Sequence, residues 1–211
     1  EDKVLDEISS YNYKIDQTSK SIGFFLQSDW EISPEINLLS GVRVDKHNFL
    51  ENLIFSPRIS TLYKPISNLQ FRANWSTGFR APQAFDTDLH IAFAGGGVSR
   101  VSLSENLREE RSNSLSASIN YDYPTENFVY GFTVEGFYTK LNNAFLLTSI
   151  GEDDFGERFE KQNGANAIVK GFTFELRANY KKKIQLDGGF NIQSSRYKNA
   201  VEYIEGLNPV R

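Results

Sequence analysis

Apolar and polar residues alternate along this chain with a period of two, repeatedly and over long stretches. In residues 69–80 the odd positions carry Leu, Phe, Ala, Trp, Thr and Phe, and the even positions carry Gln, Arg, Asn, Ser, Gly and Arg. Successive side chains of a strand point to opposite faces, so this alternation predicts a β-strand with one apolar and one polar face. The pattern predicts about eight strands, over residues 21–30, 38–46, 56–64, 69–80, 114–123, 128–139, 172–180 and 184–193.

Short and long connections alternate between these predicted strands. The short ones are rich in turn-forming residues or lysine and predict hairpins at residues 33–37, 65–68, 123–127 and 181–183. The long ones predict loops over residues 47–55, 83–107 and about 141–169. Short turns at one rim and long loops at the other are typical of barrels in the bacterial outer membrane.

Strand length favours a membrane barrel over a soluble sheet. Strands of soluble proteins average about 5–6 residues, whereas membrane-spanning strands need about 9–11, and several of these runs are that long. The polar faces carry charges at several levels, which predicts a hydrated lumen. These charged residues are Asp29, Arg43, Asp45, Arg58, Arg72, Arg80, Glu135, Glu175, Arg177 and Asp187. Periodicity alone also fits a soluble sheet whose apolar face packs on a second sheet.

Composition changes this picture little. The 211 residues are 39% hydrophobic and 14% aromatic, with a net charge of -4 and no basic block, so nothing indicates nucleic-acid binding. No apolar run approaches the roughly 18 residues of a spanning helix, and residues 1–6 lack the features of a signal peptide. Membrane strands are polar at every second position, so low hydropathy does not argue against a membrane.

Two hairpin-like segments in the first half carry family motifs. Gly23–Trp30 and then Leu39–Asp45 are similar to an F-x-Q-x-x-W … G-x-R-x-D hairpin, and Trp75–Pro82, which follows Ser56–Ser60, contains the more specific Gly-Phe-Arg-Ala-Pro. With these motifs the chain resembles the barrel of TonB-dependent outer-membrane receptors.

Two later segments extend the resemblance. Leu103–Ser112 resembles the family's N-P-x-L-x-P-E-x-S segment, although Glu105 and Arg108 stand where the family has prolines. Asn163–Phe172 is similar to N-x-x-x-A-x-x-x-G-x-E, with Glu175 slightly later than the usual glutamate. The order of all these segments strengthens the resemblance.

The resemblance implies a fold and a function. The expected fold is all-β, an antiparallel transmembrane β-barrel, with about eight strands of a larger barrel of roughly 22. Residues 1–211 would form part of this barrel, with the plug domain and the C-terminal strands absent. The implied function is that of an outer-membrane uptake receptor importing a ferric siderophore, haem or cobalamin. Its partners would be membrane lipid and, through the absent plug and N-terminal box, the TonB complex.

The loop over residues 83–107 is the predicted ligand site. It combines acidic, basic and aromatic side chains suited to holding a chelate or a macrocycle. The candidates are Asp86, Asp88, His90, Phe93 and Arg100. The resemblance adds that haem receptors of the family place an axial histidine between the two motifs that flank His90, and imidazole binds iron.

No catalytic motif, resident cofactor or metal site is predicted. The chain has two histidines and no cysteine, and it lacks the short motifs of metalloproteases, phosphate-binding loops and serine hydrolases. The acids at 152–154 and Glu157 do not have the spacing of a calcium loop and are expected to be solvated. Two other functions remain open: a plugless outer-membrane adhesin or assembly barrel, and a soluble β-rich binding module.

Aromatic residues cluster near the ends of the predicted strands. Membrane barrels place amphipathic rings at both interfaces with water. The residues predicted to form such belts are Trp30, Tyr63, Trp75, Tyr121, Tyr123, Tyr138 and Tyr180.

Overall fold

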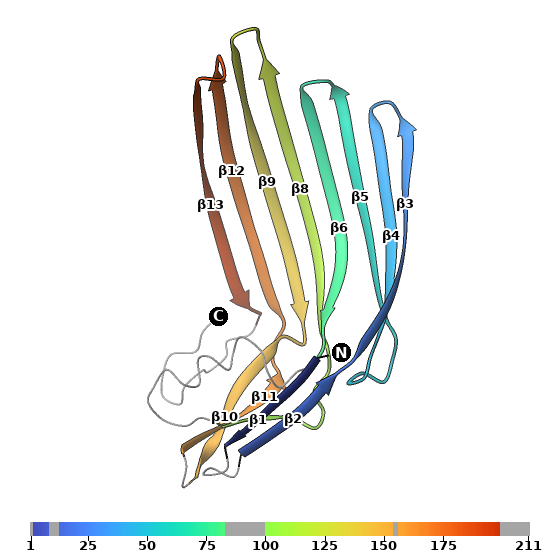
Figure 1. The fold of residues 1–211 in the computed structure, drawn as a ribbon, viewed down its shortest axis with the longest axis vertical. Coiled ribbons are helices and arrows are strands. Elements are labelled where there is room, and N and C mark those ends of the chain that lie inside the picture. Colours follow the sequence, from blue (N-terminus) through green and yellow to red (C-terminus); the bar gives the residue numbers. More distant parts are fainter. Residues whose placement is uncertain (1, 9–12, 83–99, 154–155, 199–211) are drawn as a thin grey trace.

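The computed structural model describes residues 2–8, 13–82, 100–153 and 156–198, and every element in these ranges is a strand (Figure 1). The elements are β1 (Asp2–Ile8), β2 (Tyr13–Ser19), β3 (Ser21–Ser33), β4 (Ile36–His47), β5 (Ile54–Ile66), β6 (Leu69–Arg80), β7 (Arg100–Leu103), β8 (Glu110–Pro124), β9 (Phe128–Asn142), β10 (Phe145–Asp153), β11 (Gly156–Asn163), β12 (Ala167–Tyr180) and β13 (Ile184–Tyr197).

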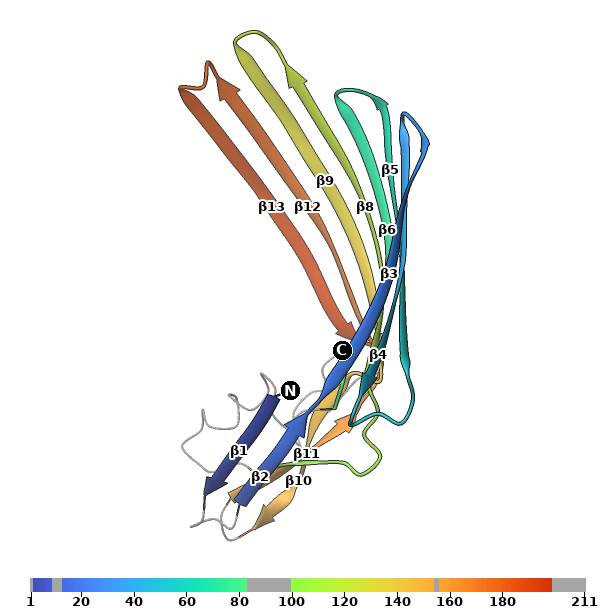
Figure 2. The same ribbon diagram turned by 45° about the vertical axis from the view of Figure 1, so that its right-hand side comes forward.

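Eight long strands form one antiparallel sheet in the order β13-β12-β9-β8-β6-β5-β4-β3. Figures 1 and 2 show this sheet as a tall, curved wall whose short hairpin turns all lie at one end. The strands are 12 to 15 residues long, for example 12 in β6 and 15 in β9. All eight predicted strands are present, and the all-β, antiparallel prediction is confirmed.

The register of the sheet fixes which side chains share a face. Strand β12 pairs with β9 without interruption, from Ala167 opposite Leu141 to Tyr180 opposite Phe128. The same continuity runs from β12 to β13, from Ala167 opposite Tyr197 to Tyr180 opposite Ile184. With so few irregularities, the polar positions of neighbouring strands line up in rows across one face and the apolar positions across the other.

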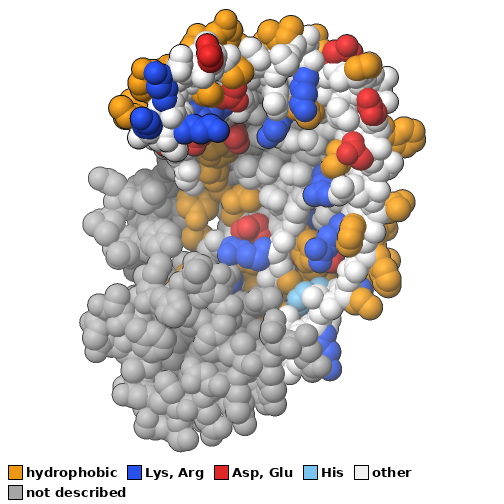
Figure 3. Space-filling view, turned by 45° about the horizontal axis from the view of Figure 1, so that its top comes forward, with side chains coloured by type: hydrophobic (Ala, Val, Ile, Leu, Met, Phe, Trp, Pro, Cys, Tyr) orange, Lys and Arg blue, Asp and Glu red, His pale blue; other side chains and the backbone are white. Residues whose placement is uncertain are grey.

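The outer face of the sheet is apolar and largely exposed. On β3 alone, the exposed fractions are 73% for Phe24, 74% for Leu26 and 59% for Ile32. Figure 3 looks into the hollow of the other face, where acidic and basic side chains gather. Large exposed apolar surfaces on soluble proteins mark contact with a partner or a membrane, so the outer face requires an apolar environment. Within the described residues, no helix is long and apolar enough to cross a membrane.

Aromatic side chains form a belt across the outer face near the short turns. Ring centroids are 5.4 Å apart for Tyr123 and Tyr130, 5.7 Å for Tyr121 and Phe132, and 6.0 Å for Tyr63 and Phe71. Trp30, Tyr63, Tyr121, Tyr123 and Tyr180 lie at this end, whereas Trp75 and Tyr138 lie toward the loops on the same outward face. The two groups match the two interfaces of a membrane barrel.

The structure corrects two of the three predicted long loops, which contain strands of their own. Residues 141–169 include β10 and β11, and residues 83–107 include β7, and these three strands form a second sheet in the order β10-β11-β7. Strand β7 has four residues and pairs with β11 in parallel. Such a short strand has no measurable alternation, and its partner lies far away in sequence, so periodicity could not reveal it.

A polar network ties three strands together on the lumen face near the turns. Arg177 of β12 donates from Nε to Oδ1 of Asp122 (2.7 Å), from Nη1 to Oγ1 of Thr133 (2.9 Å) and from Nη2 to Oδ1 of Asn120 (3.1 Å). Arg177 reaches β8 by crossing β9 at Gly131, which is in register with both Arg177 and Asp122. A Cβ at position 131 would collide with the Asp122 carboxylate and the Tyr121 carbonyl.

We predict that Gly131→Ala destabilises the barrel by about 1–3 kcal/mol, because the added methyl group overpacks the Arg177 crossing. The measurement is urea unfolding of the intact protein in detergent micelles. Gly136→Ala is the matched control on the same strand, because its Cβ would meet nothing nearer than the Gly171 carbonyl at 4.0 Å. Equal unfolding midpoints for the two variants would contradict this account of the crossing.

Candidate functional site

A pocket of about 340 Å³ opens on the lumen face of β3, β4, β5 and β6, toward the loop end of the sheet. Alternate residues of the four strands point into it. They are Phe25 and Gln27 of β3, Arg43 of β4, Ser56 and Arg58 of β5, and Ser76 of β6. We call this set the lumen pocket.

The strand register places these side chains in two adjacent rows. Phe25 is opposite Arg43, which is opposite Ser56, in one row. Gln27, Gly41, Arg58 and Ser76 are in register in the other. Gly41 leaves room beside Arg58, because a Cβ there would lie 3.3 Å from Arg58 Nε. The alternation that builds the membrane wall therefore also gathers two guanidinium groups and an exposed aromatic ring.

The two arginines of the lumen pocket have different partners. Arg43 Nε donates to both carboxylate oxygens of Asp45, at 2.9 and 2.8 Å, and Asp45 is 2% exposed. Arg58 donates from Nη2 to Oε1 of Gln27, an uncharged amide. Among the described residues, the charge of Arg43 is thus balanced and that of Arg58 is not. The lumen pocket keeps a net positive charge.

Ser56 Oγ is a buried polar atom that the described residues leave without a hydrogen-bond partner. Buried hydroxyls in native proteins nearly always have a partner, so an unsatisfied one calls for an explanation. Ser56 lies opposite Arg43 on the neighbouring strand. A hydroxyl beside guanidinium groups is suited to an oxygen-rich anion, because charge-assisted bonds from Arg are strong and directional.

A second group of contacts lies where the wall meets the loop strands. Arg80 at the end of β6 forms an ion pair with Glu110 at the start of β8, with Nη2 and Oε2 3.2 Å apart. Two cations lie over the Phe145 ring, with Arg80 Cζ 4.7 Å and Lys161 Nζ 4.9 Å from its centroid. The backbone N–H of Phe145 donates to Glu110 Oε2 at 3.1 Å. Strand β10 therefore starts from a fixed position on the wall.

Asn163 links the two long loops. Its Oδ1 accepts from the Arg108 backbone N–H at 2.7 Å, and its Nδ2 donates to the Arg108 carbonyl at 2.9 Å and to the Asn143 carbonyl at 3.0 Å. The parallel pairing of Arg158–Lys161 with Arg100–Leu103 adds a backbone ladder between the same loops. Residues 100–108, which include the described end of the predicted ligand loop, are therefore joined to the β10–β11 hairpin.

A buried histidine anchors a third loop. His47 at the end of β4 is 4% exposed; its Nδ1 accepts from the Phe49 backbone N–H and its Nε2 donates to Ser19 Oγ, both at 3.2 Å. It lies beyond Lys46, the first charged outward position of β4, and so outside the membrane-spanning part. Burial lowers the pKa of His47. Both ring nitrogens are occupied, so His47 is not available to bind iron.

Most of the predicted site residues lie outside the described residues. These are Asp86, Asp88, His90 and Phe93. Arg100 is the first residue of β7, where its backbone is in register with Arg158 of β11. The described part of the chain contains no group of three His, Asp or Glu residues suited to a metal ion. The acids at 152–154 and Glu157 fall partly outside that part.

The lumen pocket cannot be recognised as a site from the sequence alone. In the sequence, Arg43 and Arg58 are charges on the polar faces of predicted strands, and Phe25 belongs to a segment that resembles a family motif. The available signal was Phe25 itself, an aromatic residue at a polar position of the β3 alternation. Combining it with Arg43 and Ser56 required the register of three strands.

The comparisons with known proteins agree with this geometry. The chain matches the family described as "TonB dependent receptor-like, beta-barrel" over residues 2–209, and it belongs to that family. Proteins of this family lie in the bacterial outer membrane, and this location holds for the chain as well. None of the curated proteins matches the sequence.

Solved structures with this fold carry different cargo. The siderophore receptor PirA from Pseudomonas aeruginosa is 17% identical, with a TM-score of 0.72 over 87% of this chain and 35% of that one. The FrpB iron transporter from Neisseria meningitidis is 18% identical, with a TM-score of 0.58 over 85% and 26%. The copper transporter OprC is 11% identical, with a TM-score of 0.63 over 92% and 33%. The chain thus spans about a third or less of these structures.

We predict that the loop anchored by His47, residues 47–50, loses stability as the pH falls. The pKa of His47 in the folded protein is below its unfolded value of about 6.5, so the unfolded loop binds a proton more readily. Stabilisation is complete above about pH 6.5 and is lost as the pH falls through the lowered folded pKa. Hydrogen exchange of residues 47–50 at pH 7.5 and 5, corrected for intrinsic rates, measures this. His47→Gln removes the pH dependence, and an unchanged dependence in that variant would contradict the assignment.

We also predict that Asn163→Ala separates the two loops while leaving the wall intact. The variant loses three hydrogen bonds, which corresponds to a local destabilisation of about 1–3 kcal/mol. Hydrogen exchange of residues 100–103 should rise, because β7 loses the neighbouring hydrogen bonds of Asn163 that hold the two loops together. Exchange in β12 should stay constant. Gln162→Ala is the neighbouring control. If β7 is equally protected from exchange in Asn163→Ala and in this control, Asn163 does not hold the two loops together.

Proposed function

We propose that this chain forms part of the wall of an outer-membrane receptor that takes up an anionic metal chelate, with a ferric siderophore as the favoured cargo. The observation that carries this proposal is the lumen pocket, where Arg58 has no carboxylate partner and Ser56 Oγ no hydrogen-bond partner within the described residues. Both groups suit the oxygen atoms of an anionic ligand entering from the loop end.

The positions of the loops support a two-stage path. The joined loops β7, β10 and β11 stand at the loop end of the wall, and they include the predicted ligand residue Arg100. The lumen pocket lies below them on the inner face. A chelate held first by loop side chains would then meet the exposed Phe25 ring, which is 79% exposed, and the Arg58 guanidinium. Transport onward would use the TonB complex through a plug domain, as in a complete receptor.

The solved relatives are consistent with a metal cargo. They include a siderophore receptor, an iron transporter and a copper transporter by their names. Haem and cobalamin are the other cargoes that the family resemblance implies. Among the residues of this chain, His90 is the candidate axial ligand for haem, because both ring nitrogens of His47 are bonded.

We predict that Arg58→Gln weakens binding of an anionic ferric chelate by roughly 10- to 100-fold, because a charge-assisted hydrogen bond contributes about 1.5–3 kcal/mol. The measurement is quenching of tryptophan fluorescence in the intact receptor, titrated with anionic and neutral ferric siderophores. Arg72→Gln is the matched control, since Arg72 faces the same lumen outside the pocket. Equal effects of the two substitutions would contradict the lumen pocket as a binding site.

The haem alternative is tested with the same intact receptor. Haem binding that is lost in His90→Ala, and is indifferent to Arg58→Gln, would replace the chelate proposal with a haem receptor. An intact receptor that binds no chelate or macrocycle and lacks a plug would favour the adhesin function instead.

A further inference from the structure

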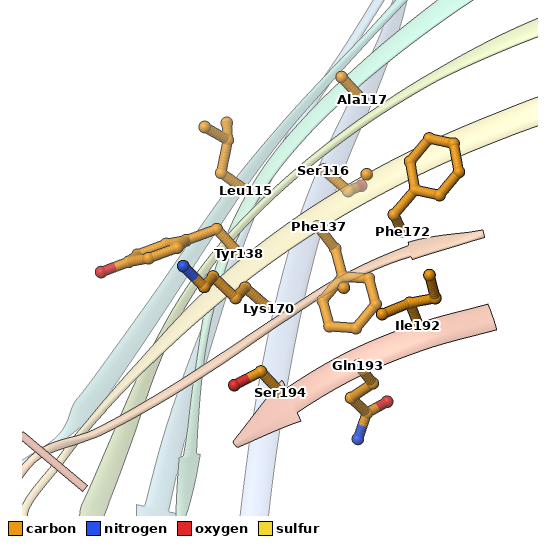
Figure 4. A pocket seen from close by; sticks show the side chains of 12 residues that line it. Leu115, Ser116, Ala117, Phe137, Tyr138, Lys170, Phe172, Ile192, Gln193 and Ser194 are labelled. Atoms are coloured by element: carbon orange, nitrogen blue, oxygen red, sulfur yellow. The ribbon is translucent and has the colours of Figure 1, made fainter. Parts of the chain in front are cut away.

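The outer face of β8, β9, β12 and β13 contains a groove of about 530 Å³ with almost purely apolar lining. Its outward-facing residues come from two adjacent rows of the register. One row holds Leu115, Tyr138, Lys170 and Ser194, and the other holds Ala117, Gly136, Phe172 and Ile192. Figure 4 shows Tyr138 and Lys170 extending in the same direction from neighbouring strands, with Phe172 and Ile192 beyond them.

The floor of the groove exists because two small residues interrupt the outer face. Gly136 and Ala117 are opposite each other on β9 and β8, and a Cβ on Gly136 would meet nothing nearer than the Gly171 carbonyl at 4.0 Å. Larger side chains surround this depression, with exposed fractions of 55% for Leu115 and 64% for Ile192. The volume lies in the range of about 300–1,000 Å³ that is typical of small-molecule sites.

Three cations lie on the outward face at the loop end of this groove. Lys140 and Arg196 are both in register with Ile168, and Lys170 is two residues farther along β12. All three are exposed, and no ion pair joins any of them to a described residue. Neighbouring strands are about 4.8 Å apart, so the three backbones lie within roughly 10 Å of one another.

Charge on these four strands is separated by face. Every Asp and Glu within them belongs to the lumen-facing set, which consists of Glu110, Asp122, Glu135, Glu175 and Asp187. The outward face of the same strands carries cations without carboxylates. It would therefore attract an anion, and the apolar groove next to it would accept a hydrocarbon chain.

The groove lies at the depth of a lipid head group. Lys170 and Tyr180 are roughly 33 Å apart along β12, at about 3.3 Å per residue, and Tyr180 lies in the aromatic belt. With a strand tilt of about 40°, this corresponds to about 25 Å across the membrane, the height of the apolar band of a membrane barrel. Lys170 thus marks the interface at the loop end, and the groove extends from it into the hydrocarbon region.

We propose that this groove, together with Lys140, Lys170 and Arg196, is a binding site for a phosphorylated lipid of the outer leaflet. The cations hold the phosphate, and one acyl chain lies over Gly136 between Leu115, Tyr138, Phe172 and Ile192. The site faces the membrane and is independent of the cargo bound in the lumen.

The test is native mass spectrometry of the intact receptor in detergent, titrated with diphosphorylated lipid A and with the same lipid after removal of its phosphates. We expect preferential binding of the phosphorylated lipid. Replacing Lys140, Lys170 and Arg196 together by Gln should weaken it on the order of 100-fold, at about 1 kcal/mol for each cation. Gly136→Leu should fill the groove and weaken binding by at least about tenfold.

The matched control replaces Lys181, Lys182 and Lys183 by Asn, which removes the same charge at the opposite end of the strands and should leave lipid binding unchanged. The circular dichroism of each variant confirms that its sheet is intact. The proposal is overturned by equal binding of both lipids, by equal losses in the two triple variants, or by an unaffected Gly136→Leu. Competition by inorganic phosphate at millimolar concentration would overturn it in favour of a free-phosphate site.

Discussion

Hydrocarbon offers no hydrogen-bond partner, so a strand that crosses a membrane must satisfy every backbone N–H and C=O from a neighbouring strand. The uninterrupted ladders of β12 with β9 and β13 meet this requirement over their full length. This backbone pairing also determines where the side chains lie, because a fixed register assigns each residue to lipid or to water. The apolar belt, the polar lumen, the lumen pocket and the outer groove all follow from that assignment.

Glycine residues interrupt the regular rows of side chains on both faces of the sheet. Gly131 lets Arg177 cross a whole strand to Asp122, and Gly41 leaves space beside Arg58 in the lumen pocket. Gly136 opens the outer groove between larger apolar side chains. In each case, one missing side chain in a row creates room that a neighbouring group uses or that a ligand could occupy. The functional candidates on both faces are thus local gaps in an otherwise repetitive wall.

The eight wall strands could be predicted because each carries its own signal, as in 69–80, where every second residue is polar. The loop strands could not: β7 is four residues long and is held by a partner more than fifty positions away. The lumen pocket was hidden for a similar reason, since Phe25, Arg43 and Ser56 meet only through register. The predicted loop candidates Asp86, Asp88, His90, Phe93 and Arg100 remain predictions.

The central claim is that one face of each wall strand meets lipid and the other meets water. The chain contains no cysteine, so single cysteines can be placed along β12 without background from this region. The measurement is labelling of the intact receptor in native membranes with a water-soluble maleimide, at each position from 172 to 177. The account predicts labelling at Thr173, Glu175 and Arg177 and protection at Phe172, Phe174 and Leu176. Uniform labelling of all six positions would show a sheet bathed in water on both faces and would contradict it.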